Sequence, residues 1–334
     1  MDLRLDPLQE RLRDAVDAVL TRTGEPYAQL ATIGVPTLNA PERFGGLALG
    51  LSADIVVNER LGYGLEPLGC YRATAFALDL LDGDDMPTEH LAEVVADLNK
   101  GARHAVVVGA PGPASARVAS DGRLWGESEP LPRGDIGLCV ARAVRDDGTV
   151  GWHLVVPETG TCSVESIDHF GMPASRLRFD GAAARPLTVS TAHWERALAA
   201  ARIRQAALLL GMADRILDVA RAHVNTRIQS GKPLVRHQTV AHRLATLMGE
   251  AVGWRLVLHK AAWEIDRGER CSTAEVLAVA AEHARLASRT ALQLHGVRGM
   301  LAHSTTATAY RAIAVESVRL GTPADLWLEA ASAT

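Results

Sequence analysis

The chain has 334 residues, 48% of them apolar and only 4% aromatic, and a net charge of −4. At roughly 100–200 residues per domain, this length predicts two or three domains, and a core built mainly from Ala, Leu and Val favours packed helices over sheets. The chain contains no long basic run, which argues against binding of nucleic acid through a broad phosphate footprint.

The first region, residues 1–102, is predicted to be a helical domain. Residues 3–20 carry apolar side chains at helical spacing and lack the uninterrupted apolar segment of a signal peptide. Residues 41–46 contain a proline and two adjacent glycines and are predicted to form a loop. Ser52 is predicted to cap the helix that follows, and a further helix is expected over 90–98.

In the second region, residues 103–190, the apolar residues no longer follow helical spacing. It consists of short apolar runs separated by turn signals such as Asp121-Gly122 and Asp146-Asp147-Gly148. Short strands at such spacing predict a small β-barrel or sandwich. A doubly wound parallel sheet is disfavoured because no long helix separates the strands.

The third region, residues 191–334, returns to helical periodicity. Ser272 and Glu275 form a capping box at the start of its third helix. The second helix is expected to bury one apolar face, which carries Leu244, Leu247, Met248, Val252 and Leu256. The expected helices cover 194–226, 239–266, 273–295 and 305–320. Four long amphipathic helices with short links predict a four-helix bundle.

The four cysteines lie far apart and form no CxxC pair, so neither a zinc site nor a disulfide framework is expected. His237 and His242 are poorly spaced for two ligands on one helix face, and no metal site is predicted. The sequence has no uncharged apolar stretch of about 18 residues, the length that a membrane helix needs. We therefore expect a cytoplasmic protein that does not cross a membrane.

Four local patterns, in this order along the chain, resemble the acyl-CoA dehydrogenases. Residues 41–47, followed by Glu59-Arg60-Leu61-Gly62, are similar to the family pattern PEEYGG…EELG. Residues 227–238 resemble RxxFGKxLxxxQ, and residues 293–299 resemble QxxGGxG. Finally, Tyr310-Arg311 precedes Gly321-Thr322 as YRDA precedes EGT in the family. The resemblance covers nearly the whole chain.

This resemblance implies a mostly α fold with a central β domain: an N-terminal helical domain, a small β-barrel and a C-terminal four-helix bundle. It also implies α,β-desaturation of an acyl thioester with FAD. In that reaction a carboxylate base removes the α hydrogen as a proton, and the β hydrogen leaves as a hydride to the flavin. The family buries its bundle between subunits, so we expect a homo- or hetero-oligomer, as a dimer or tetramer.

The resemblance assigns roles residue by residue. Arg227 matches an arginine that contacts the FAD pyrophosphate of a neighbouring subunit, Trp125 matches a residue beside the flavin ring, and Arg202 matches an arginine that supports the active site around the substrate. The implied cofactor-binding residues are Arg227, Gln238, Gln293, Gly296, Trp125 and Thr322. Structural interpretations stay open for these positions: a helix end for Arg227, a C-cap for Gly296, core for Trp125 and a solvated helix face for Arg202.

The catalytic carboxylate is missing from both positions where the family carries it. The glutamate of EGT is replaced by Leu320, and the alternative position on the first bundle helix is Ala201. Glu195-Arg196 lies too early along that helix to substitute. Glu316, one turn before Leu320, is a weak candidate base, and its other interpretation is a surface charge beside Arg319.

The flavin contacts also depart from the family pattern. Residues 109–115 replace the barrel segment TEPxAGSD, and Glu127 stands after Trp125, where its negative charge is unfavourable beside a reduced, anionic flavin. Ser230 and Ala312 replace a phenylalanine and an aspartate of the pattern.

Two interpretations follow for the activity. In the first, the chain is the base-lacking subunit of a heteromeric acyl-CoA dehydrogenase, an assembly known from the breakdown of steroid side chains, and it shares or lends its part of the FAD site. In the second, it is a repurposed homo-oligomer that desaturates or cyclises a carrier-bound acyl group in a biosynthetic pathway, with Glu316, His303 or the substrate supplying the base. A non-catalytic structural partner is a further alternative, and the acyl group is presented by CoA or by a carrier protein.

Overall fold

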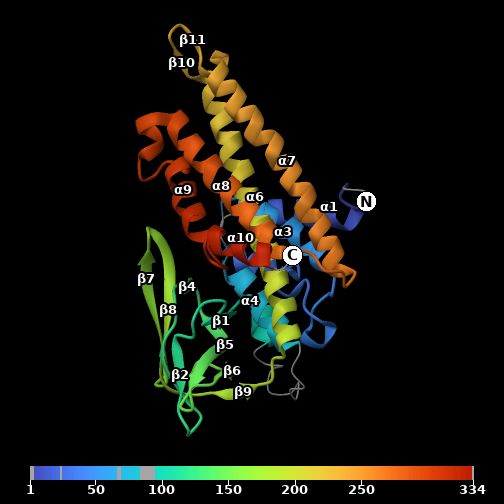
Figure 1. The fold of residues 1–334 in the computed structure, drawn as a ribbon, viewed down its shortest axis with the longest axis vertical. Helices are drawn as coiled ribbons and strands as arrows, with labels where there is room; N and C mark the ends of the chain where they lie inside the picture. The colour runs from blue at the N-terminus through green and yellow to red at the C-terminus, as the bar shows by residue number, and fades with distance from the viewer. Residues whose placement is uncertain (1–3, 23–24, 66–68, 83–94, 333–334) are drawn as a thin grey trace. The chain divides into compact units, whose positions relative to one another are not determined.

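The computed structural model describes residues 4–22, 25–65, 69–82 and 95–332, and Figure 1 shows their helices and strands. The chain divides into two compact units. Unit 1 comprises Met1–Leu20, Leu51–Pro67 and Arg202–Thr334, and unit 2 comprises Thr21–Gly50 and Leu68–Ala201. The division into three regions at residues 102 and 190 stays a prediction.

Unit 1 is helical. Its helices are α1 (Pro7–Leu20), α3 (Leu51–Tyr63), the larger part of α6 (Thr191–Thr226), α7 (Gln238–Asp266), α8 (Thr273–His295), α9 (Thr305–Glu316) and α10 (Pro323–Ser332). A short hairpin of β10 (Ile228–Gln229) and β11 (Lys232–Pro233) and the 3-10 turn η3 (Leu234–Arg236) join α6 to α7, and a second turn, η4 (Gly296–Met300), follows α8. None of the helices in the described part of the chain has the length and apolar character needed to cross a membrane.

The predicted helices of the third region are confirmed with small changes at their ends. The helix α8 has the predicted bounds, and the Ser272 hydroxyl accepts the backbone N–H of Glu275 at 3.4 Å, as the capping box requires. The fourth helix ends at Glu316 instead of 320, and the additional helix α10 was not expected. The Thr322 hydroxyl accepts the backbone N–H of Asp325 at 3.2 Å, which caps α10, and Pro323 takes its first position.

The helices α3 and α6 cross at two glycines. A Cβ atom on Gly62 would lie 2.1 Å from the backbone oxygen of Leu208, and one on Gly211 would lie 2.1 Å from the backbone oxygen of Glu59. Only residues without a side chain allow the two backbones to approach this closely. Beside this crossing, the fully buried Arg204 of α6 pairs with the fully buried Asp54 of α3, which compensates both charges.

The N-terminus of α3 is capped from a distant part of the chain. The carboxylate of Asp266, the last residue of α7, accepts the backbone N–H of Leu51 at 2.6 Å and that of Ser52 at 2.9 Å. The Ser52 hydroxyl also donates to Asp266, at 2.6 Å. The prediction that Ser52 caps this helix was therefore wrong, because Asp266 satisfies the helix's free N–H groups.

The apolar face predicted for α7 is only partly core. Leu244 and Leu247 are buried, whereas Val252 and Leu256 are 57% and 42% exposed. The exposed apolar side chains continue through neighbouring turns, and the ion pair of Lys260 and Glu264 lies on the same side of the helix. We call this surface the α7 face, and it comprises Gly249, Val252, Gly253, Leu256, Val257 and Trp263.

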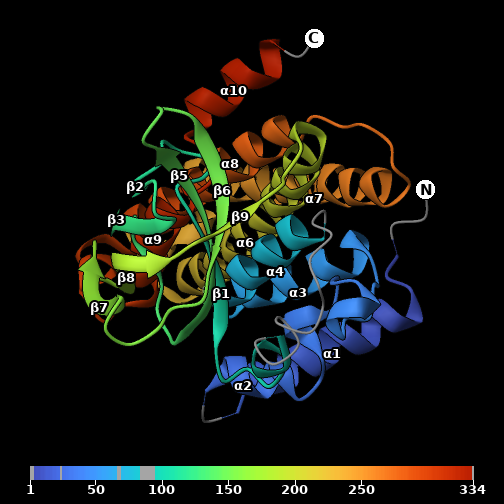
Figure 2. The same ribbon diagram turned by 90° about the horizontal axis from the view of Figure 1, so that it is seen from below.

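Unit 2 combines short helices with a mixed sheet, seen from a second direction in Figure 2. Its helical elements are α2 (Pro26–Ala31), η1 (Val35–Thr37), η2 (Glu42–Phe44) and α4 (Gly69–Leu81), and residues 95–99 are also helical. The remainder of the helix predicted over 90–98 lies outside the described residues. The strands are β1 (His104–Val108), β2 (Ala116–Val118), β3 (Arg123–Glu127), β4 (Leu131–Pro132), β5 (Ile136–Arg145), β6 (Val150–Val155), β7 (Cys162–His169), β8 (Met172–Ala183) and β9 (Arg185–Leu187).

The strand pairing confirms a central β domain but differs from a closed barrel. The order is β4-β8-β3-β2-β5-β6-β9, with β1 paired to β5 and β7 paired to β8. Strands β1 and β2 both pair with β5 in parallel, and the other pairs are antiparallel. Among the described residues the terminal strands β4 and β9 are not paired with each other, and they are only 2 and 3 residues long. Such short strands leave few backbone groups with which to close the sheet.

Candidate functional site

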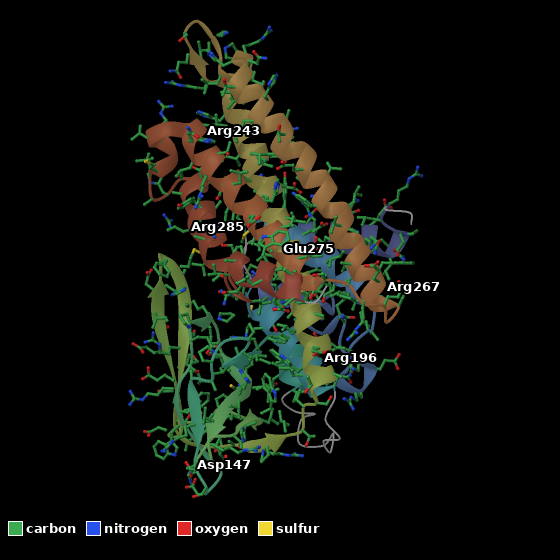
Figure 3. All side chains as sticks on the ribbon, viewed as in Figure 1. Asp147, Arg196, Arg243, Arg267, Glu275 and Arg285 are labelled. Atoms are coloured by element: carbon green, nitrogen blue, oxygen red, sulfur yellow. The ribbon has the colours of Figure 1, made fainter. Side chains whose placement is uncertain are left out.

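Four of the predicted cofactor-binding residues lie at one end of the helices of unit 1. We call this the hairpin end, and it comprises residues 223–243 and 293–298. Arg243 of α7, labelled in Figure 3, donates to the side-chain oxygen of Gln293 at 2.8 Å. The rings of His223 on α6 and His295 on α8 stack with centroids 4.1 Å apart. These two contacts bring the ends of α6, α7 and α8 together.

The backbone positions the predicted residues at this end. Arg227 directly follows α6, and its carbonyl accepts the backbone N–H of Leu234 across the β10–β11 hairpin at 2.8 Å. Its side chain is exposed, as is that of Gln238 at the start of α7. Gly296 ends α8 with a φ of 60°, and a Cβ atom there would meet nothing within 4 Å. This glycine is needed for its backbone angle, and it leaves open space in front of the chain.

The charge at the hairpin end has a single sign. Residues 219–249 contain five Arg and Lys residues and no Asp or Glu, and residues 283–315 contain four Arg residues and no Asp or Glu. The whole chain nevertheless has a net charge of −4. A cluster of basic side chains beside a glycine, in segments that contain no carboxylate, suits an anion such as a pyrophosphate. The residues present here therefore fit the pyrophosphate part of a dinucleotide cofactor.

Arg202, the predicted active-site arginine, is held by the last helix. It is 5% exposed, and its two terminal nitrogens donate to the Glu329 carboxylate of α10 at 2.6 and 2.7 Å. Its Nε atom is buried and has no hydrogen-bond partner among the described residues. The hydrogen bonds from Arg202 lower the pKa of Glu329. The solvated helix face that was an open alternative for Arg202 is wrong, because the guanidinium is buried and paired.

The two positions that carry the base in the family are apolar and buried, with Leu320 8% exposed and Ala201 6% exposed. Glu316 is also buried, at 4% exposure, so the alternative of a surface charge is wrong. Its carboxylate accepts hydrogen bonds from Arg319 at 2.8 and 2.9 Å and from Gln205 at 2.9 Å. This arrangement stabilises the ionised form and occupies both oxygens, which favours a structural role over proton abstraction.

Thr322 already has two local partners. Its hydroxyl donates to the Asp325 carboxylate at 2.6 Å and accepts the Asp325 backbone N–H at 3.2 Å. The side chain thus serves as the N-cap of α10. A contact of Thr322 with a cofactor, as the resemblance implies, stays a prediction that competes with this capping role.

The two predicted flavin-side features of unit 2 lie on β3. Trp125 is 41% exposed, and its ring fills the space beside Gly181, where a Cβ atom would lie 3.1 Å from the indole. It is therefore not a core residue, which leaves an indole face for a ligand. Glu127 lies 3.7 Å from a terminal nitrogen of Arg178, and this exposed pair partly offsets its negative charge.

A carboxylate that was not singled out in the sequence occupies the segment matched to TEPxAGSD. The oxygens of Glu129 accept the backbone N–H of Gly109 at 3.0 and 3.2 Å, and the Ser115 hydroxyl donates to one of them at 3.4 Å. These donors, in the segment that resembles a flavin-binding segment of the family, are therefore engaged by the chain itself. No pattern in the local sequence indicates this contact.

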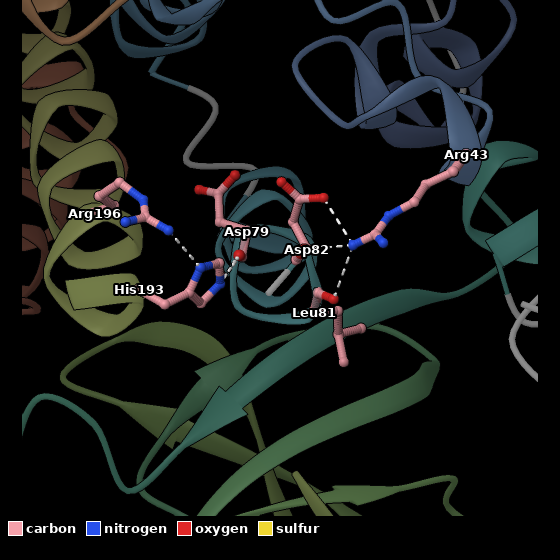
Figure 4. Close-up of polar contacts among 6 residues, drawn as sticks. All are labelled: Arg43, Asp79, Leu81, Asp82, His193 and Arg196. Atoms are coloured by element: carbon pink, nitrogen blue, oxygen red, sulfur yellow. Dashed lines mark hydrogen bonds and ion pairs between the residues drawn. The ribbon is translucent and has the colours of Figure 1, made fainter. Parts of the chain in front are cut away.

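The residue pair Glu195-Arg196 does not replace the missing base pair of the family. Arg196 donates to Nδ1 of His193 at 3.1 Å, and the opposite ring nitrogen lies 2.8 Å from the Asp79 carbonyl (Figure 4). In the same view Arg43 binds the Asp82 carboxylate at 2.8 Å. These contacts hold the C-terminal end of α4. They give Arg196 a structural role and leave Glu195 exposed.

Comparison with known proteins gives the following similarities. Residues 192–327 match the model of the acyl-CoA dehydrogenase C-terminal domain. The chain thus resembles the acyl-CoA dehydrogenase family over this C-terminal part. It is 28% identical to (2S)-methylsuccinyl-CoA dehydrogenase of Cereibacter sphaeroides over 81% of this chain, and the match spans only 56% of that longer protein.

Two further proteins are similar to the chain in sequence or in fold. The chain is 24% identical to L-prolyl-[peptidyl-carrier protein] dehydrogenase of Pseudomonas fluorescens, with 84% of this chain and 82% of that protein covered. It superposes on a chain of the ChsE4-ChsE5 complex of Mycobacterium tuberculosis with a TM-score of 0.83 and 21% identity, covering 99% of this chain and 98% of that one. The described part of the chain contains no cluster of three or more His, Cys, Asp or Glu residues suited to a metal ion.

Proposed function

We propose that this chain is the base-lacking subunit of a heteromeric acyl-CoA dehydrogenase and that its hairpin end binds the FAD pyrophosphate of a partner subunit. The observation that carries the proposal is a difference between two parts of the chain. The hairpin end offers cationic and backbone donors without any carboxylate. The segment 109–115, by contrast, has its donors bound by Glu129.

The missing base supports the same conclusion. Removing the α proton of an acyl thioester requires a carboxylate or a comparable base in reach of the substrate. Leu320 and Ala201 cannot accept a proton, and the Glu316 carboxylate is held by Arg319 and Gln205. When bound, FAD supplies the hydride acceptor. The partner subunit then supplies the base for an acyl thioester, and this chain supplies Arg227, Gln238, Gln293 and Gly296 to the cofactor.

The α7 face supports assembly with a second, homologous chain. Val252, Leu256 and Trp263 are 57%, 42% and 42% exposed and lie on one helix beside Gly249 and Gly253. Small residues between large apolar ones let another helix approach closely, and exposed apolar side chains gathered on one side of a helix, here with the Lys260–Glu264 ion pair among them, suit an interaction site. The relative with known structure named above is likewise a complex of two chains.

The proposal is tested by the visible absorption spectrum of the purified chain, first alone and then co-purified with a dehydrogenase-like partner that has an intact base. We expect a colourless protein alone and a yellow complex. The Arg227→Gln variant should reduce the FAD affinity of the complex roughly 10–100-fold, the cost of a lost charge-assisted hydrogen bond. Arg221→Gln is the matched control, because Arg221 on the same helix pairs with Asp218 at 2.9 Å.

A repurposed homo-oligomer acting on a carrier-bound acyl group is the second candidate, favoured by the similarity to L-prolyl-[peptidyl-carrier protein] dehydrogenase. The same spectrum separates the two candidates. A chain that is yellow by itself, with one FAD per subunit, and that oxidises a carrier-bound acyl group would replace the heteromeric proposal.

A further inference from the structure

The hairpin end contains two stacked histidines from different helices. His223 lies in the last turn of α6 and His295 is the last residue of α8, with an angle of 22° between their rings. The Nδ1 atom of His295 lies 2.8 Å from the carbonyl oxygen of Ala291. Since a carbonyl oxygen only accepts, Nδ1 carries a proton and Nε2 is the atom that gains or loses one. The family pattern QxxGGxG leaves the position of His295 variable and has a glycine where this chain has Val297.

The surroundings of the pair are cationic from each element that packs against it. Arg227 follows α6, Arg298 lies in η4, and Arg243 of α7 reaches α8 through Gln293. Burial lowers the pKa of His223, and the positive charges of His295, Arg227 and Arg298 lower it further, against a small opposing effect of the Leu294 carbonyl. No carboxylate belongs to the segments 219–249 or 283–315, so no negatively charged side chain in them favours a proton on the pair.

An anion would reverse this balance. Two imidazoles 4.1 Å apart repel each other when both are charged. A phosphate oxygen placed between the guanidinium groups and the rings would instead favour the protonated form, since an opposite charge within about 4–6 Å raises the pKa of a histidine. Binding of the anion and uptake of a proton are then thermodynamically coupled.

We propose that the His223–His295 stack is a proton-coupled phosphate site, at which the binding of a pyrophosphate-bearing ligand is accompanied by proton uptake. The inference rests on the proposed function, because it assigns to these histidines a role in the half-site for the partner's cofactor. The site recognises the pyrophosphate group, which FAD and CoA share. The flavin dinucleotide is the expected ligand because Gln293, Gly296 and Arg227 surround the stack.

Isothermal titration calorimetry of the full chain tests the inference with three ligands: inorganic pyrophosphate, FAD and CoA. Each titration is repeated in buffers with different ionisation enthalpies, which yields the number of protons taken up. We expect net uptake at pH about 7 and an affinity that falls by up to about tenfold per pH unit as the pH rises, the limit for one coupled proton. FAD should bind more tightly than CoA.

Single substitutions distinguish the effect of the two histidines on ligand binding from the effect of the positive charge around them. His295→Asn and His223→Gln should abolish proton uptake and remove the pH dependence of the affinity. Arg227→Gln should weaken binding at every pH and retain a proton uptake that the two histidine variants lack. The matched control is His242→Gln, an exposed histidine of α7 outside the stack.

The outcomes distinguish this inference from the proposed function. Binding of FAD or pyrophosphate without proton uptake overturns the inference and leaves the heteromeric proposal intact. Tighter binding of CoA than of FAD overturns the assignment of the site to the cofactor. Failure of all three ligands to bind overturns the inference outright. If the chain alone is yellow, the heteromeric proposal fails, and titration of its FAD-free form still measures the proton uptake.

Discussion

Arg202 and Glu329 are joined by two hydrogen bonds of 2.6 and 2.7 Å, although 127 positions separate them in the sequence. The pair connects α6 with the last helix, α10. A second contact holds α10, because Nε1 of Trp327 donates to the Glu282 carboxylate of α8 at 3.0 Å. The C-terminal helix is thus attached to the bundle by polar contacts from two residues of the same turn.

Glu329→Gln should lower the free energy of unfolding by about 1–2 kcal/mol, because it leaves the buried guanidinium of Arg202 without its counter-charge. This change in the free energy of unfolding is small for a pair with a buried guanidinium, because the Glu329 side chain is 53% exposed and water replaces part of the interaction. Chemical denaturation measures the change, and Glu195→Gln, an exposed position on α6, is the control. Equal stability of the two variants would contradict the prediction.

The same pair predicts a pH dependence. Arg202 lowers the pKa of folded Glu329 below 4.5, so its contribution is present above about pH 4.5 and is lost as the pH falls through the folded-state value. The difference in stability between the wild type and Glu329→Gln should therefore shrink in this acidic range. A difference that stays constant down to the acid-unfolding transition would argue against the pair.

His104 predicts a second, distinct pH dependence. Burial lowers the pKa of this β1 residue from 6.5 to about 4. The unfolded chain therefore binds a proton that the folded chain does not, and stability should decline by roughly 3 kcal/mol as the pH falls from 6.5 to about 4. His104→Asn should remove this part of the slope, whatever its effect on absolute stability. His303→Gln, an exposed histidine, should leave the slope unchanged.

Replacing glycine by alanine is predicted to lower the stability at the crossing of α3 and α6 and to raise it at an open position of α7. Gly62→Ala and Gly211→Ala should each lower the free energy of unfolding by about 3 kcal/mol or more, since the new methyl group meets backbone atoms that cannot move aside. Gly249→Ala should raise it by about 0.5–1 kcal/mol, because nothing lies within 4 Å of its Cβ position in the helix α7. Thermal melting of the three variants in parallel checks both directions.

The α7 face predicts a defect in assembly without a defect in folding. Val252→Glu should weaken association with the second chain by about tenfold or more, because it places a charge in an apolar contact. The same change at Val164 on β7, which is 46% exposed, is the control. Sedimentation velocity measures the association, and circular dichroism checks the fold. Unaltered association of Val252→Glu would exclude the α7 face as the interface.

The helices of the third region could be predicted because their signals are local. Apolar spacing located α6 to α8 to within three residues at each end, and Ser272 marked the start of α8. Thr322, Pro323 and Asp325 form a comparable helix-start pattern for the short helix α10. That helix was not predicted, because Thr322 was assigned to a cofactor motif instead. The start of α10 could therefore have been predicted from these three residues alone.

The contacts that define the candidate site could not be predicted from the sequence. Glu129 binds Gly109 and Ser115 across 20 and 14 positions, and Glu329 binds Arg202 across 127, so no periodicity relates the partners. A carboxylate in a sequence has no preferred partner until the chain is folded. The burial of Glu316 was missed for the same reason, since Gln205 of α6 lies 111 positions away from it, and only its neighbour Arg319 could be named from the sequence.

The capping of α3 by Asp266 has a consequence for synthesis of the protein. The backbone N–H of Leu51 binds a residue that lies 215 positions further along the chain. At a synthesis rate of about 5–20 residues per second, that residue is added roughly 10–40 s later. During that time α3 lacks both its cap and the helix α6 that covers Gly62. Its apolar side chains, including Ile55 and Val57, which are fully buried in the finished protein, are then open to chaperones on the ribosome.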